Sequence, residues 1–130
     1  KHRHRQRYFK IQHNFFRSLS KYFLNPIETL NCNTAWLAFP ILIKDDAPFT
    51  RQQFQIFLEE RNIQTRVVFT GNILRQPMCA NINKKVLDTG YPNADAIMER
   101  GVLLPVHHGL TEAMIERLHS TINLFISERA

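Results

Sequence analysis

Three short apolar runs alternate with segments of helical period, and this alternation restricts the fold more than any other feature of the sequence. The runs are WLAFPILI at 36–43, the stretch 65–69, and Val102 to Leu104. Each has the length of a strand, and Pro40 limits the first run to an edge, a bulge or two short pieces. The connections between them are too long for simple hairpins. The pattern predicts an α/β two-layer sandwich, in which helices cover one face of a small, mostly antiparallel sheet.

The first 24 residues predict a basic amphipathic helix. Apolar residues recur at steps of three and four from Tyr8 to Phe23, and Pro26 marks where the helix should end. Residues 1–23 hold seven Lys and Arg and no acid, which leaves 10 basic and 11 acidic residues in the rest of the chain. Nucleic-acid-binding domains usually carry basic charge across a folded face rather than on one terminal segment. We therefore expect a solvated helix that links to a preceding domain, and no nucleic acid as partner; a basic nucleic-acid-binding module is the alternative.

Further helices are predicted by their capping residues, and a long loop separates two of them. The expected caps are Thr50 for a helix over 50–61, with Gln53 closing a capping box, Asn93 for a short helix to Arg100, and Thr111 for the last helix. Gly71 predicts a tight backbone bend. Residues 72–92 show no sustained period, so they predict a long loop of the kind that often carries function.

Size and composition predict one domain of 130 residues, with an α/β body over 36–130. Cys32 and Cys79 lie outside any CxxC pair, so we expect neither a disulfide framework nor a metal site. No apolar run approaches the roughly 20 residues of a membrane-spanning helix, and no targeting segment opens the chain. These features predict a cytoplasmic protein without a membrane partner. Because the chain opens at Lys1 in what reads as the middle of a helix, we expect a piece of a longer protein.

A polar cluster surrounds the bend at Gly71 and comprises Arg66, Asn72, Arg75 and Gln76. The planar fork of Arg matches phosphate or carboxylate, and amides can orient a sugar hydroxyl or a carbonyl. We interpret the cluster as an anion-binding site; the alternative is surface arginines beside a turn asparagine. The sequence offers no nucleophile with a base, no phosphate-binding glycine loop and no HExxH. We expect neither catalytic nor cofactor-binding residues in this chain.

Three motifs resemble a known family: TRVVFTGNILRQP at 65–77, LLPVHHGLT at 103–111 and WLAFPI at 36–41. They are similar to the C-terminal small domain of the DegT/DnrJ/EryC1/StrS family of nucleotide-sugar enzymes, whose fold is that of aspartate aminotransferase. The pattern of Arg, Phe-x-Gly-Asn and Arg-Gln-Pro is closest to the CDP-4-keto-6-deoxyglucose-3-dehydrase branch. The resemblance implies that the matching residues line the sugar-nucleotide side of a cleft, with Phe69 as an apolar wall. Those residues are Arg66, Phe69, Asn72, Arg75 and Gln76.

The resemblance also implies the chemistry of the longer enzyme. Pyridoxamine phosphate (PMP) or pyridoxal phosphate (PLP) would be bound mainly outside this chain. CDP-4-keto-6-deoxyglucose would be joined to this cofactor and would then lose its C3 hydroxyl. The reaction would belong to deoxysugar and lipopolysaccharide O-antigen biosynthesis. An upstream lysine in place of histidine would instead indicate a PLP-dependent sugar aminotransferase. The isolated chain is expected to be inactive.

The implied partners are the nucleotide sugar, the large domain of the same chain, a reductase and a second copy. Some members of this branch carry an iron–sulfur cluster, for which Cys32 and Cys79 are too few. Self-association would cover an apolar face left open on the small domain. The candidates for that face are Phe9, Phe15, Phe16 and Phe23.

Overall fold

A computed structural model describes residues 2–32 and 34–129. Lys1, which belongs to the expected first helix, lies outside the described residues. The elements in chain order are α1 (His2–Ser18), β1 (Phe23–Leu24), β2 (Ala38–Ile43), α2 (Arg51–Glu59), β3 (Arg66–Val67), the short 3₁₀ helices η1 (Ile73–Arg75) and η2 (Pro77–Cys79), α3 (Pro92–Arg100), β4 (Gly101–Pro105) and α4 (Glu112–Ser127).

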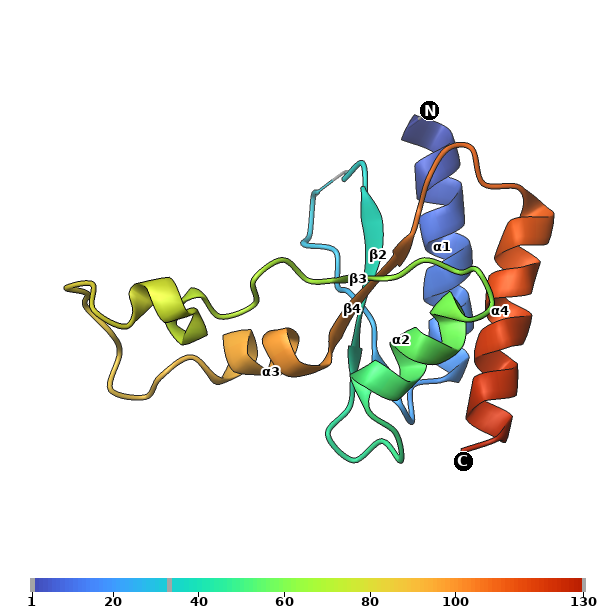
Figure 1. The fold of residues 1–130 in the computed structure, drawn as a ribbon. Helices are drawn as coiled ribbons and strands as arrows, with labels where there is room; N and C mark the ends of the chain where they lie inside the picture. Colours follow the sequence, from blue (N-terminus) through green and yellow to red (C-terminus); the bar gives the residue numbers. More distant parts are fainter. Residues whose placement is uncertain (1, 33, 130) are drawn as a thin grey trace.

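The described strands form one antiparallel sheet in the order β1-β2-β4-β3. The longest pairing joins β2 to β4, from Ala38 opposite Pro105 to Leu42 opposite Gly101. Exposure alternates along β2, so one face of the sheet is buried and the other is half-buried. Helices α1 and α4 lie side by side on one side of the sheet (Figure 1). The predicted α/β sandwich with an antiparallel sheet is confirmed.

Phenylalanine rings from five elements meet in the core. Phe16 of α1 and Phe39 of β2 are fully buried with ring centroids 5.5 Å apart, and Phe54 of α2 lies 5.2 Å from Phe125 of α4. Phe23 joins the two pairs, at 5.2 Å from Phe16 and 5.4 Å from Phe54. Each fully buried ring contributes about 2–3 kcal/mol of transfer free energy, so this cluster holds the helices against the sheet.

The first helix ends at Ser18, and the expectation that it continues to residue 24 is wrong. After a turn, the chain forms β1, which pairs with the last two residues of β2. The Ser18 hydroxyl donates to the Phe15 carbonyl at 2.6 Å, a local bond that competes with helical hydrogen bonding. Phe23 follows the helical spacing of apolar residues in the sequence and is also buried as a strand residue, so that spacing alone could not distinguish a strand here.

The four phenylalanines expected on an exposed apolar face do not form one. Phe9, Phe16 and Phe23 are 4%, 0% and 1% exposed, and Phe15 stacks on His119. The apolar stripe of α1 is the surface that packs against the sheet and α4, so it is already covered within this chain.

Pro40 lies within β2, opposite Leu103 of β4. Strand β1 pairs only with Leu42 and Ile43, so among the described residues no strand neighbours β2 on that side at Pro40. The missing N–H of proline therefore interrupts no ladder there. The expectation of an edge position holds locally, although β2 is an inner strand of the sheet.

Local capping signals predicted two of the three helix starts. The Thr50 hydroxyl accepts from the Gln53 N–H at 3.2 Å while the Gln53 side chain accepts from the Thr50 N–H at 2.8 Å, which confirms the capping box. The Thr111 cap is confirmed as well. The Asn93 cap is wrong, because α3 begins one residue earlier at Pro92, whose fixed φ suits a first helical position.

None of the helices in the described part of the chain has the length and apolar character needed to span a bilayer.

His119 of α4 is packed against the first helix. Its ring stacks on Phe15 with centroids 3.8 Å apart and planes 3° apart. Its Nε2 is buried and has no hydrogen-bond partner among the described residues. This burial lowers the pKa of His119 to about 4, because the charged imidazolium would lose hydration. His119 is therefore neutral in the folded protein near neutral pH.

We expect the stability of the fold to decrease as the pH falls from 6.5, the ordinary pKa of histidine, towards about 4. In this window the unfolded chain takes up a proton at His119 that the folded chain excludes, which lowers the free energy of unfolding. Above pH 6.5 His119 is neutral in both states, and the free energy of unfolding is not reduced by this proton. Urea unfolding at a series of pH values measures the effect. The His119→Phe variant, which keeps the ring stacking, should lose this part of the pH dependence. Equal slopes for both proteins would contradict the prediction.

Candidate functional site

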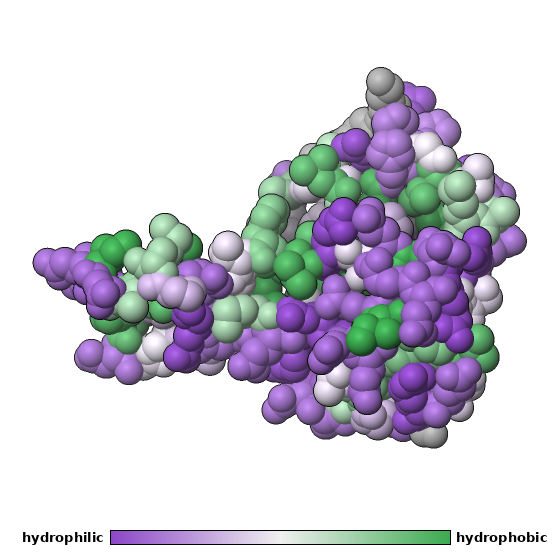
Figure 2. Space-filling view, in the orientation of Figure 1, coloured by the Kyte–Doolittle hydropathy of each residue, from purple (hydrophilic) through white to green (hydrophobic). Residues whose placement is uncertain are grey.

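Residues 68–91 leave the body after β3 and return to it through α3; we call this segment the arm (Figure 1). It contains η1 and η2 and otherwise has no regular secondary structure in the described chain, as expected for the long loop. Figure 2 shows hydrophobic residues on the arm and where it joins the body. The large hydrophobic residues exposed on the arm are Phe69, Ile73, Met78, Ile82, Val86 and Leu87.

The arm begins with a tight bend that packs against α3. Phe69 has φ +47° and Gly71 has φ +64°, both in the left-handed region. The Phe69 conformation explains why β3 ends at Val67 instead of continuing to 69 as expected. At Gly71 a Cβ atom would lie 2.2 Å from the Cβ of Met98 in α3, so only glycine lets the two segments approach this closely. The expected bend at Gly71 is confirmed.

Two of the predicted site residues meet on one carboxylate of α3. Arg75 donates from Nε to Asp95 Oδ1 at 3.0 Å and from Nη2 to Asp95 Oδ2 at 2.8 Å. Asn72 donates from Nδ2 to the same Oδ1 at 2.8 Å. The Asn72 side-chain oxygen accepts from the Leu74 N–H at 3.0 Å, so both ends of this 5% exposed amide are used within the fold.

Asp95 is strongly stabilised as an anion. The hydrogen bonds from Arg75 and then from Asn72 lower its pKa to about 2. The same carboxylate raises the pKa of Arg75 above its usual value. Asp95 also lies in the first turn of α3, where the helix dipole favours negative charge. The pair therefore stays ionised across the working pH range of proteins.

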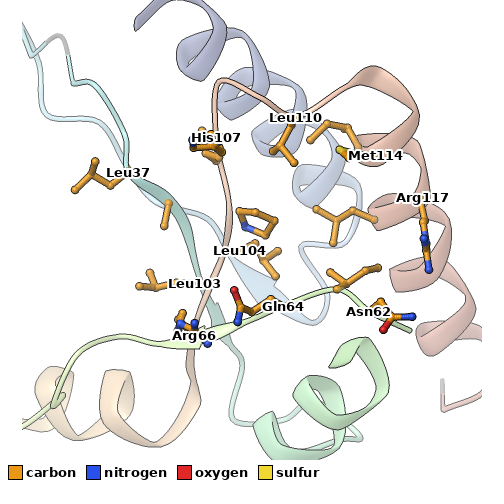
Figure 3. A pocket seen from close by; sticks show the side chains of 16 residues that line it. Leu37, Asn62, Gln64, Arg66, Leu103, Leu104, His107, Leu110, Met114 and Arg117 are labelled. Carbon is orange, nitrogen blue, oxygen red and sulfur yellow. The ribbon is translucent and has the colours of Figure 1, made fainter. Parts of the chain in front are cut away.

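Arg66 lies elsewhere, at the rim of a cavity of about 510 Å³ in the body. The cavity lies between the segment that precedes β3, the end of β4 and the start of α4 (Figure 3). Leu104, Ile115 and Leu118 are among its apolar walls. With its amide oriented to satisfy its neighbours, Gln64 accepts from both terminal nitrogens of Arg66 at 3.1 and 2.9 Å.

The five predicted site residues therefore do not form one cluster. Asn72 and Arg75 meet at Asp95, while Arg66 lines a cavity to which none of the other four contributes. The Gln76 amide donates to the Thr70 carbonyl at 3.1 Å and closes the bend. Phe69 is 87% exposed.

Sequence reasoning missed Asp95 and Gln64. Asp95 follows Arg75 after a loop without a repeating pattern, and nothing local indicates the contact. One signal could have indicated this contact. The helix that follows the loop has an acidic residue, Asp95, in its first turn, and the motif at the start of the loop contains arginine. Gln64 is two residues from Arg66 in an extended segment, where side chains at that spacing share a face.

Cys32 is exposed and Cys79 is buried, and neither forms a disulfide. The described residues contain no group of three or more His, Cys, Asp or Glu side chains placed to hold a metal ion.

The fold places the chain in the class of aminotransferase-fold proteins. A solved structure of GDP-4-keto-6-deoxy-D-mannose-3-dehydratase from Escherichia coli, with bound hydrated PLP, matches 92% of this chain and 29% of that chain, with a TM-score of 0.77 and 22% identity. The model of the DegT/DnrJ/EryC1/StrS aminotransferase family matches residues 1–123. The chain belongs to this family.

Three curated relatives are similar in sequence. A dTDP-4-dehydro-2,6-dideoxy-D-glucose 3-dehydratase of Saccharopolyspora spinosa is 35% identical over 81% of this chain and 22% of its own length. The lipopolysaccharide biosynthesis protein RfbH of Salmonella typhimurium is 32% identical over 77% and 23%. A dTDP-4-amino-4,6-dideoxy-D-glucose transaminase of Escherichia coli is 28% identical over 68% and 24%. The chain thus spans about a quarter of the length of these relatives.

The contact between the bend and α3 predicts unequal effects at two glycines. Gly71 and Gly90 have φ of +64° and +65°, but a Cβ at Gly90 would meet no atom within 4 Å. Gly90→Ala should therefore cost only the strain of a positive φ, about 1 kcal/mol. Gly71→Ala should cost about 2–4 kcal/mol, because its methyl group also overlaps Met98. Urea unfolding of both variants measures the difference, and equal costs would show that the close approach is absent.

Proposed function

We propose that the chain is the C-terminal small domain of a longer PMP- or PLP-dependent nucleotide-sugar 3-dehydratase. Its substrate would be of the CDP-4-keto-6-deoxyglucose type, in deoxysugar and lipopolysaccharide O-antigen biosynthesis. The proposed role of this domain is to bind the nucleotide sugar through the start of the arm. Membership of the family and the relatives named as 3-dehydratase and lipopolysaccharide biosynthesis protein support this proposal.

The observation that carries the proposal is the exposed guanidinium of Arg75, held at the base of the arm. Its side chain is 62% exposed although two of its nitrogens are bonded to Asp95. A planar, permanently charged fork in a fixed orientation suits the diphosphate of a nucleotide sugar. Phe69, at the same bend, offers an apolar wall. Of the five predicted substrate-binding residues, we propose that Arg75 and Phe69 contact the substrate at the base of the arm. Asn72 and Gln76 would hold the bend that carries them, and Arg66 would act only from the separate cavity in the body.

A PLP-dependent aminotransferase would need a lysine placed to form a Schiff base with the cofactor. No lysine is among the described residues that line the cavity beside Arg66. The Lys84 ammonium donates to the Cys79 carbonyl within the arm. We therefore propose that PMP or PLP is bound mainly by the rest of the enzyme, where it would supply the electron sink for the loss of the C3 hydroxyl.

A PLP-dependent sugar aminotransferase is the second candidate, and the transaminase relative favours it. The two activities differ in what happens to the sugar. A dehydratase expels the C3 oxygen as water, whereas an aminotransferase replaces the keto oxygen at C4 with nitrogen from an amino acid. A product analysis therefore separates them.

We expect the full-length enzyme, incubated with PMP and CDP-4-keto-6-deoxyglucose in heavy-oxygen water, to place label at C3 of the sugar. Reversible loss of the C3 hydroxyl requires this exchange, and mass spectrometry with fragmentation locates the label. The matched reaction contains PLP and glutamate instead of PMP. Formation of an amino sugar in the reaction with PLP and glutamate, together with no label at C3 in the reaction with PMP, would favour the aminotransferase.

Removal of the Arg75 guanidinium should weaken use of the substrate. We expect Arg75→Ala in the full-length enzyme to lower kcat/KM by roughly 30-fold, which corresponds to about 2 kcal/mol for one charged hydrogen-bonding partner. Arg17→Ala is the control, because Arg17 is also exposed but lies on α1, away from the arm. Steady-state kinetics measure both. An unchanged kcat/KM for Arg75→Ala would refute the role of Arg75.

A further inference from the structure

Asp95 belongs to α3, but it contacts two residues at the start of the arm, where we propose that the substrate binds. It accepts two hydrogen bonds from Arg75 and one from Asn72, at 2.8–3.0 Å. These bonds occupy the edge of the guanidinium formed by Nε and Nη2. Among the described residues, none accepts a hydrogen bond from Nη1 of Arg75. The edge formed by Nη1 and Nη2 therefore keeps free N–H groups that face away from Asp95.

The carboxylate is fixed by the fold rather than by the arginine. Asp95 belongs to α3, which leads directly into β4 and packs against the bend through Met98 and Gly71. Its side chain is 25% exposed, whereas that of Arg75 is 62% exposed. The more deeply placed partner therefore determines the position of the more exposed one.

An exposed arginine loses much of its rotamer freedom when a ligand immobilises it. A carboxylate that already holds one edge of the guanidinium removes much of this loss before the ligand arrives. The free edge then presents two parallel N–H donors, the geometry that matches two oxygens of a phosphate group. Within a nucleoside diphosphate sugar, the diphosphate is the group that carries the negative charge.

We propose that Asp95 is a positioning residue that aims the free edge of the Arg75 guanidinium at the diphosphate of the nucleotide sugar. The proposal rests on the proposed function, because that function assigns substrate binding to Arg75. Asn72 completes the arrangement by donating to the oxygen that also accepts from Arg75 Nε. Asp95 itself does not touch the substrate in this arrangement.

The test is a double-mutant cycle in the full-length enzyme, with CDP binding measured by calorimetry and with steady-state kinetics. Asp95→Asn should weaken CDP binding about tenfold and raise KM by a similar factor while kcat changes less than about twofold. In the Arg75→Ala background, the same substitution should change CDP binding by less than about twofold, because the side chain it positions is gone. Asp95→Glu should restore part of the affinity.

Glu99→Gln is the matched control. Glu99 is an exposed acid of the same helix that acts on Arg75 through its charge without accepting a hydrogen bond from it. It should leave CDP binding unchanged, and an effect equal to that of Asp95→Asn would show that net charge matters rather than position. Melting temperatures identify variants whose fold is lost, in which case Asp95→Ser takes the place of Asp95→Asn in the cycle.

The outcomes separate the inference from the function on which it rests. If Arg75→Ala weakens CDP binding and Asp95→Asn does not, the positioning role is overturned and the proposed function stands. If the two substitutions have additive effects, Asp95 acts independently of Arg75 and the inference fails. If Arg75→Ala itself has no effect on CDP binding or kcat/KM, both the assignment of Arg75 and the role of Asp95 are overturned.

Discussion

The pairing of β2 with β4 is the contact on which the rest of the structure depends. It joins residues from opposite halves of the chain over five positions and buries one face of each strand beneath the helices. Strand β4 pairs on its other side with β3. The arm and α3 lie between β3 and β4 in sequence, so the sheet brings the two ends of this insertion to one edge. The position of the candidate site follows from this topology.

At that edge, close packing and charge act together. Gly101, where α3 enters β4, has room for no side chain: a Cβ atom there would lie 2.5 Å from the Ile97 carbonyl oxygen and 2.9 Å from the Val68 side chain. Gly71 meets Met98 in the same way. These contacts bring the start of the arm within hydrogen-bonding distance of the first turn of α3, where Asp95 binds Arg75 and Asn72. The rest of the arm extends away from the body.

Features encoded by neighbouring residues could be predicted from the sequence, and features that depend on distant partners could not. The capping box at Thr50 and the bend at Gly71 are set by a few adjacent residues, and both were predicted correctly. Strand β1 exists because β2 offers its edge, and the phenylalanines of α1 are buried because the sheet and α4 cover them. The apolar spacing in the sequence is compatible with either outcome. The two arginines of the motif, Arg66 and Arg75, are close in sequence, but the bend at Gly71 separates them.

The geometry at Asp95 suits arginine better than another cation at position 75. A guanidinium has separate edges, so one edge can bond to the fold while another remains free for an anion. The ammonium group of lysine is a single point of charge on a flexible stem. Bound to Asp95, it would have no second edge with a defined direction, and released from Asp95 it would have no defined position. A residue that joins the arm to α3 and still presents a directed pair of donors must therefore be arginine.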